Sequence, residues 1–401
     1  MSLDQEMTVK SKRVRALADK LRVALVIETS SSYGRGLLSG IVRFRQTSRN
    51  WSVFLEQRDL TSEFPDWLAN WEGDGIISRA TTPALADAVA STNVPLVELT
   101  DRRQDFGFTY VWSNDAAIGK LGAEHLIDRG FQNFAFCGFD DEAWSLRREV
   151  AFEEAIRNVS HQLSESYRTS WFGENVAQWD VQQSQIVEWL HSLPKPVAIM
   201  ACNDVRGQQV IDACSRAGLL VPEQVAVLGV DDDALLCQLC DPPLSSVVPN
   251  AELIGYRAAE LLAQEMTGER AVVRKHLVDP IGVTHRQSTD TFAVEDPEVA
   301  KALSFIRDRA CAGIGVDDVA RHVGVSRSTL ERKLRRYSNR SPQEHIRKAQ
   351  IRQAQELLVK TELPIDHIAT VCGYEHPEYL HVVFRRELNM TPGEFRRDSQ
   401  R

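Results

Sequence analysis

Between Leu21 and about Thr284, short apolar runs alternate with longer segments whose apolar residues recur every three or four positions. The run Leu21–Glu28 is almost continuously apolar, which is typical of a strand covered on both faces. The predicted strands are Leu21–Glu28, Trp51–Glu56, Gly75–Ile77, Pro95–Leu99, Asn133–Cys137, Val197–Cys202 and Val225–Val230. The predicted helices are Tyr33–Ser48, Pro83–Ala90, Ala116–Arg129, Glu142–Asn158, Val176–Leu193, Asp204–Ala217 and Glu252–Met266, followed by extended segments to about Thr284.

This alternation predicts an α/β architecture with parallel sheets, and its length predicts two lobes. A polar stretch then separates this region from a last segment whose pattern is helical throughout, beginning with an amphipathic helix over Val299–Arg309. We therefore expect a mobile tail or short helix at residues 1–20, a two-lobed α/β domain at 21–286, a linker at 287–297 and an all-α domain at 298–401.

The helical segment contains one short pattern twice, at Val316–Leu330 and at Ile365–Tyr379. In both copies an alanine, Ala320 or Ala369, precedes a glycine by four positions. A small side chain lets two helices cross closely, and glycine tolerates the positive φ of a tight turn. A single copy would also suit a helical hairpin inside a core. Two copies in matching register favour two helix-turn-helix units, at about 316–337 and 365–388.

The second helix of each unit would be the one that enters a major groove of DNA. Ser326 is a suitable N-cap for the first of them, and Pro377 suits the first turn of the second. Arginine on such a helix reads guanine near its start or contacts phosphate near its end, although any one charge could also belong to a solvated face. The predicted DNA contacts are Arg327, Ser328, Arg332 and Arg336 in the first unit and His376, Glu378, His381 and Arg385 in the second.

The charge distribution supports this division of the chain. All 401 residues together carry a formal net charge of −9, which by itself would disfavour DNA binding. From Pro297 onward, however, 19 Lys and Arg stand against 14 Asp and Glu, a net of +5. The residues before Pro297 include 28 Lys and Arg and 42 Asp and Glu, a net of −14. A basic DNA-binding domain joined to an acidic body is therefore expected.

The duplicated pattern and the closing run Val383–Arg397 resemble the DNA-binding domain of the AraC/XylS family of transcription regulators. The resemblance covers about the last hundred residues. Leu380 departs from it, since the family usually carries Phe there, but Leu still fills a core position.

The α/β region resembles the type I periplasmic-binding-protein fold of LacI/GalR regulators. The motifs that carry the resemblance are Leu121–Gly130, Arg148–Phe152, Ala201–Asp204, Val225–Asp232 and Pro242–Ser246. It covers most of residues 21–285, and it implies a sugar-sensing domain.

Polar side chains at the carboxyl ends of parallel strands form the expected ligand site. Acids, amides and arginines gather there, and these groups pair with sugar hydroxyls. The resemblance implies sugar contacts for Asn114, Asp115, Arg148, Asn203 and Asp231, with Tyr33 and Arg35 as candidates from the opposing lobe.

Each of these residues has a simpler alternative role. An Asp at a strand end can be a helix N-cap, which is the alternative role of Asp204 and of Asp231. Arg148 could form a surface salt bridge. Trp112 or Trp144 could stack on a sugar ring, but tryptophan more often belongs to a core.

Joining a LacI/GalR-like sensor to an AraC/XylS-type domain resembles the plan of the bacterial xylose-operon regulators. Local stretches such as Asp296–Val299, Phe305–Cys311 and Trp189–Pro194 also carry this resemblance. It implies a homodimeric activator that binds operator DNA and responds to a small sugar, D-xylose above all. Another pentose, a hexose, or repression in place of activation remain alternatives.

Two other classes of protein fit less well. An enzyme acting on sugars or nucleotides would need a phosphate loop, a metal motif or a nucleophile motif, and none occurs in the sequence. A periplasmic binding protein would need a signal peptide, whereas residues 1–20 are polar. Scattered cysteines and the lack of a long apolar run predict a cytoplasmic protein without membrane contact, cofactor or metal.

Overall fold

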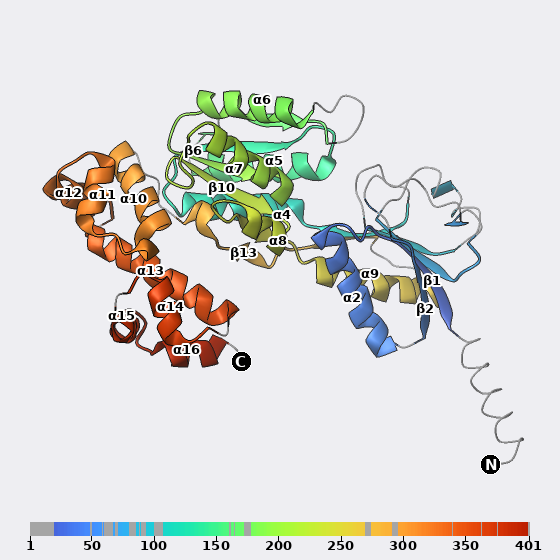
Figure 1. Cartoon of the computed structure of the whole chain (residues 1–401). Coiled ribbons are helices and arrows are strands. Elements are labelled where there is room, and N and C mark those ends of the chain that lie inside the picture. Colours follow the sequence, from blue (N-terminus) through green and yellow to red (C-terminus); the bar gives the residue numbers. More distant parts are fainter. Residues whose placement is uncertain are drawn as a thin grey trace, which may run out of the picture.

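The computed structural model describes residues 20–48, 50–57, 59, 67–68, 71–79, 86–87, 89, 94–99, 107–159, 162–163, 165–171, 178–268, 274–290, 296–338, 340–361, 363–374 and 376–399. These residues form two α/β lobes and a helical C-terminal domain, with the second lobe between the other two (Figure 1). The predicted fold class is therefore confirmed. The N-terminal tail up to residue 19, most of the helix predicted over 83–90, and linker residues 291–295 lie outside the described residues.

The first lobe contains a parallel six-stranded sheet in the order β12-β5-β4-β3-β1-β2. Its strand β1 is buried over four consecutive residues, as its continuous apolar run predicts. The helices α2 and α9 cross so closely that a Cβ on Gly255 would lie 1.9 Å from the Leu37 carbonyl oxygen. The elements are β1 (Leu21–Val26), α2 (Ser32–Ser48), β2 (Trp51–Leu55), β3 (Gly75–Ser78), β4 (Leu96–Glu98), β5 (Thr109–Ser113), α9 (Ala251–Met266) and β12 (Lys275–Val278).

The second lobe contains a seven-stranded sheet, ordered β13-β11-β10-β9-β6-β7 with β8 also paired to β6. Its pairs are parallel except that β13 runs antiparallel to β11. The elements are α4 (Asp115–Ile127), β6 (Asn133–Phe139), α5 (Ala143–Asn158), β7 (Gln162–Leu163), β8 (Tyr167–Thr169), α6 (Trp179–Ser192), β9 (Val197–Ala201), α7 (Asp204–Arg216), β10 (Val225–Val230), α8 (Ala234–Leu239), β11 (Ser245–Val248) and β13 (Gly282–Thr284).

The chain passes between the lobes three times, after β5, β11 and β12. These crossings are hydrogen-bonded to one another. The Asn114 backbone N–H donates to the Val278 carbonyl at 2.8 Å, and the Asn114 side-chain amide donates to Asp279 Oδ1 at 2.8 Å. Ile281 N–H donates to the Val248 carbonyl at 2.9 Å. The three crossings therefore form one connected hinge.

The C-terminal domain consists of two helix-turn-helix units joined by the long helix α13. Both turns contain glycine with positive φ, +87° at Gly324 and +79° at Gly373, and both Ala320 and Ala369 are buried. Ser326 Oγ accepts from Thr329 N–H at 3.2 Å, so the predicted N-cap is confirmed. The elements are α10 (Pro297–Arg309), a 3₁₀ turn (Ala310–Ala312), α11 (Val316–Val323), α12 (Arg327–Ser338), α13 (Pro342–Lys360), α14 (Ile365–Val371), α15 (Pro377–Leu388) and α16 (Pro392–Ser399).

Several elements were not predicted, namely β5, β7, β8, α8 and β11. Strand β11 begins with two fully buried serines, Ser245 and Ser246, which do not form an apolar run. Ser245 N–H donates to Ser288 Oγ at 2.8 Å, and Ser246 Oγ donates to Asp204 at 2.6 Å. Ser288 and Thr289, placed in the linker from the sequence, are likewise buried against this sheet. Such strands depend on hydrogen bonds between distant residues, which periodicity does not reveal.

Candidate functional site

The carboxylate of Asp115 is the centre of a polar cluster between the two lobes. It lies at the first turn of α4 and is 2% exposed. Its oxygens accept from Arg148 Nε at 3.0 Å, from Arg147 Nη2 at 2.8 Å and from Trp112 Nε1 at 3.2 Å. Burial raises the pKa of Asp115, while Arg148 opposes that rise. The carboxylate is thus held by three donors inside the protein.

Arg148 connects this carboxylate to the ends of two further strands. Its Nη1 donates to the Cys202 carbonyl after β9 at 2.6 Å and lies 4.0 Å from Asp231 Oδ1 after β10. Its guanidinium carbon lies 4.8 Å from the centre of the Trp144 ring. The side chain is 3% exposed, so Arg148 is a buried cation and not a surface salt-bridge partner.

Asp231 provides the more accessible carboxylate of the cluster, with a side chain 26% exposed. It and Asp232 have positive φ, 109° and 50°, which is strained for a residue with a Cβ. Asp204 holds this loop, because its carboxylate accepts from Asp233 N–H at 2.8 Å. Asp231 is therefore not a helix cap: its backbone is fixed in a strained conformation beside Arg148.

Residues of the first lobe provide the opposite side of the cluster. Tyr33 Oη and Ser113 Oγ are 2.8 Å apart, and the rings of Tyr33 and Trp112 lie 5.6 Å apart between centroids. Arg79 covers both rings, at 4.7 Å and 5.6 Å, and forms an ion pair with the buried Glu28. Arg79 was not among the predicted contacts, although it directly follows strand β3. The same strand-end rule that selected Asp231 would have found it.

Three predicted ligand residues use their side chains for local structure instead. Arg35 is exposed and donates to the carbonyls of Thr29 and Ser30. Asn114 and Asn203 each cap a helix, accepting from Ala117 N–H at 3.2 Å and from Arg206 N–H at 2.9 Å. The structure therefore brings Tyr33, Asp115, Arg148 and Asp231 together, and it leaves the other three at the edge of the cluster.

Buried carboxylates, guanidinium groups and aromatic rings together suit a small ligand rich in hydroxyl groups. Carboxylates accept from hydroxyls, arginine donates in a fixed fork, and aromatic rings cover apolar C–H faces. Trp112 and Trp144, the candidates for stacking, are 4% and 6% exposed and are largely packed in the core. Among the residues that the structure describes, no group of three potential ligands could hold a metal ion.

The variant Asp231→Asn should change how stability depends on pH. Burial raises the pKa of Asp231 from 3.8 to about 6, so the folded protein retains a proton that the unfolded chain releases. The free energy of unfolding of the native protein should then contain a contribution that decreases between about pH 4 and pH 6. Urea denaturation from pH 4 to pH 8 would show this decrease reduced in the variant. Identical profiles would contradict the assignment.

The exposed faces of α12 and α15 provide the surface predicted to contact DNA. On α12, Ser328 and Arg332 are exposed, whereas Arg327 is bound to Asp317 and Glu331 at 3.4 Å and 3.3 Å. On α15 and at His376, which directly precedes it, the predicted side chains are all exposed, namely His376, Glu378, His381 and Arg385.

Two apolar side chains of α15, Tyr379 and Val382, are also exposed, at 49% and 59%. Neither residue was among the DNA contacts predicted from the sequence. Apolar side chains on such a helix can contact the methyl group of thymine. Arg336, in the last turn of α12, instead lines a cavity between this domain and the second lobe.

Among the described residues, no helix is both long and apolar enough to cross a membrane. Three family models match the chain: a XylR N-terminal domain at residues 22–107, a periplasmic binding protein-like domain at 123–289 and a helix-turn-helix domain at 319–398. The resemblances found in the sequence are thereby confirmed.

Full-length relatives are also known. The xylose operon regulatory protein of Escherichia coli K12 is 31% identical over 390 residues, covering 94% of this chain and 96% of that protein. The protein of the same name from Haemophilus influenzae is 31% identical over 383 residues, covering 94% and 98%. A solved structure of the xylose-binding transcription activator xylR matches with a TM-score of 0.81 at 29% identity, covering 94% and 98%. These relatives are transcription regulators.

Proposed function

Because the chain belongs to the family of xylose operon regulatory proteins, we propose that the polar cluster between its lobes binds D-xylose and that sugar binding activates transcription from operator DNA. The chain is a DNA-binding regulator with a sugar-binding domain. The observation that supports the proposal most is the Asp115–Arg148–Asp231 cluster at the junction of two hinged lobes, in a chain that also carries two helix-turn-helix units.

In this mechanism the sugar joins the lobes. Asp231 accepts from sugar hydroxyls, Arg148 donates to a ring or hydroxyl oxygen, and Tyr33 and Arg79 approach from the first lobe. A ligand that contacts both lobes favours the closed arrangement of the lobes. The size of the population shift is set by the difference between the ligand's affinities for the closed and the open arrangement. The hinge of three hydrogen-bonded crossings is where this movement would occur.

A homodimer would place two pairs of helix-turn-helix units on DNA, and sugar binding would change their spacing. Another pentose or a hexose as effector, and repression in place of activation, are the alternatives. Because the protein must reach operator DNA, the cytoplasm remains our prediction for its location.

A thermal-shift screen of the full chain against D-xylose, other pentoses and hexoses tests the effector. A sugar that binds only the folded state, present at 100 times its Kd, adds about 2.7 kcal/mol of stability. We expect a selective rise with D-xylose, and the variant Asp231→Asn should lose most of it. A rise with a different sugar would discard xylose and retain a sugar sensor; no rise with any sugar would contradict the proposed sugar site.

Arg332→Ala should weaken operator binding by about 1–3 kcal/mol and relax the sequence preference at one base pair. Arg332 is exposed on α12 and forms no ion pair with any residue that the structure describes, so it is available to a base edge. Titrations of operator and random DNA at one salt concentration provide the measurement. An equal loss on both DNAs would identify a phosphate contact instead.

A further inference from the structure

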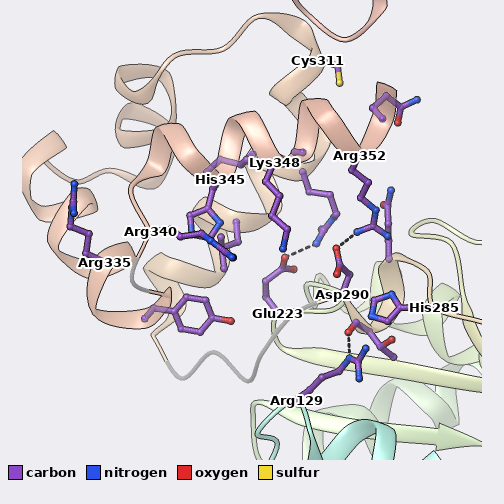
Figure 2. A pocket seen from close by; sticks show the side chains of 18 of the residues that line it. Arg129, Glu223, His285, Asp290, Cys311, Arg335, Arg340, His345, Lys348 and Arg352 are labelled. Atoms are coloured by element: carbon purple, nitrogen blue, oxygen red, sulfur yellow. Dashed lines mark hydrogen bonds and ion pairs between the residues drawn. The ribbon is translucent and has the colours of Figure 1, made fainter. Parts of the chain in front are cut away.

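A cavity of about 920 Å³ lies between the second lobe and the DNA-binding domain. Figure 2 shows Lys348 and Arg352 pointing from α13 toward Glu223 and Asp290 of the lobe, while His345 of the same helix lies beside Arg340. Apolar side chains, including those of Leu303 and Ile306, line part of the same space. The cavity is large enough for a small organic ligand.

The lining carries a large excess of positive charge. Among the residues that the structure describes, its cations are Arg129, Arg307, Arg335, Arg336, Arg340, Lys348 and Arg352 and its carboxylates are Asp128, Glu223 and Asp290, a net charge of +4. Two of the carboxylates are already paired across the domain boundary, Glu223 with Arg307 at 2.5 Å and Asp290 with Arg352.

The remaining cations lack such partners. Arg335, Arg336, Arg340 and Lys348 form no ion pair with any residue in the described part of the chain. Arg129 donates to the backbone carbonyls of Thr289 and His125 at 2.7 Å and 2.6 Å. The described residues therefore leave the positive charge of the cavity largely uncompensated.

The pKa values of titratable groups around the cavity are consistent with this excess of positive charge. Burial and the nearby cations lower the pKa of His285 and of His345 to about 4 each. Burial, with Arg340, also lowers the pKa of Lys348. Like charges gathered in a partly desolvated space repel one another, and a multivalent anion would relieve that repulsion.

We propose that this cavity binds a small multivalent anion with a phosphomonoester or pyrophosphate group. Arg340 and Lys348 would hold the anion from the DNA-binding domain, and Arg129 would do so from the second lobe. Guanidinium groups match phosphate oxygens in bidentate geometry, and lysine adds a point charge. Leu303 and Ile306 could contact the apolar part of an organic phosphate.

The bound anion would bridge the sensor to the DNA-binding domain. It would add contacts across a boundary that already carries the Glu223–Arg307 and Asp290–Arg352 pairs. The affinity for the anion would then depend on how the two domains are arranged. If operator binding changes the affinity for the anion by some factor, anion binding changes the affinity for the operator by that same factor. This site is separate from the polar cluster between the lobes and does not depend on which sugar binds there.

Calorimetric titration of the full chain with pyrophosphate, inorganic phosphate and ribose 5-phosphate tests the site. We expect pyrophosphate to bind once per chain, and Arg340→Gln and Lys348→Gln each to weaken it about tenfold, as the loss of a charge-assisted hydrogen bond does. Tighter binding of ribose 5-phosphate than of inorganic phosphate would indicate an organic phosphate as the ligand. Equal or weaker binding would indicate an inorganic anion. Circular dichroism of each variant checks that it is folded.

Two further variants serve as controls. Lys301→Gln removes an exposed cation of the same domain that does not line the cavity, and Arg332→Gln removes one from the surface predicted to contact DNA. Both should change the Kd of pyrophosphate less than about twofold. The proposal is overturned if the native chain binds none of the three anions, if Arg332→Gln alone abolishes binding, or if all four variants weaken it equally.

Discussion

Replacing Arg148 by Met is expected to lower the free energy of unfolding by about 3–5 kcal/mol and to abolish the proposed sugar binding at the polar cluster between the lobes. Methionine preserves much of the side-chain volume but removes the buried cation. Asp115 would then lose its 3.0 Å bond, and Asp231 would lose the positive charge 4.0 Å away. Two carboxylates would remain close together, and only Arg147, 44% exposed, would still be paired with one of them.

The matched control is Arg157→Met, in the same helix α5. Arg157 is 65% exposed and pairs with Glu153 four residues earlier, so its loss should change stability by less than about 0.5 kcal/mol. Urea denaturation of both variants and of the native chain measures the difference. Similar small losses in both would show that the buried cluster does not stabilise the lobe.

Replacing Gly373 by Ala is expected to destabilise the second helix-turn-helix unit by about 2–5 kcal/mol. Two effects add here. The residue has φ of +79°, which disfavours any side chain, and a Cβ would lie 2.7 Å from the Cys311 carbonyl oxygen. Because that oxygen belongs to the backbone, relieving the clash requires a shift of the turn at Gly373 or of the 3₁₀ turn, which packs against α13. Operator affinity should fall with it.

The duplicated pattern supplies the control for this prediction. Gly324 occupies the matching position of the first unit with φ of +87°, but a Cβ there would meet nothing within 4 Å. Gly324→Ala should therefore cost only the backbone strain, about 1–2 kcal/mol. Thermal unfolding and operator titration of the two variants compare them directly. A larger effect at Gly324 than at Gly373 would contradict the role of the Cys311 contact.

The order of helices and strands and the two helix-turn-helix units were predictable because their signals are local. The apolar run that predicted β1 and the Ala-Gly spacing of each unit both arise from neighbours in the chain. The two units predicted at about 316–337 and 365–388 agree with the observed pairs α11–α12 and α14–α15 to within one residue at each end. No such signal marked β11, whose buried serines are satisfied by Asp204 and Ser288.

The sequence by itself determined which strand ends carry polar groups, but only the tertiary structure decided what each group contacts. Asn114 and Asn203 have amide side chains of the kind expected to bind a sugar. They cap helices instead, because each residue lies immediately before a helix. Arg148 of α5 lies between Asp115 and Asp231 only because α5 packs against α4, which carries Asp115, and because the neighbouring strands β9 and β10 both end beside it. Likewise, the cations of α13 and the second lobe are distant in sequence, and only the packing of the two domains gathers them around one cavity.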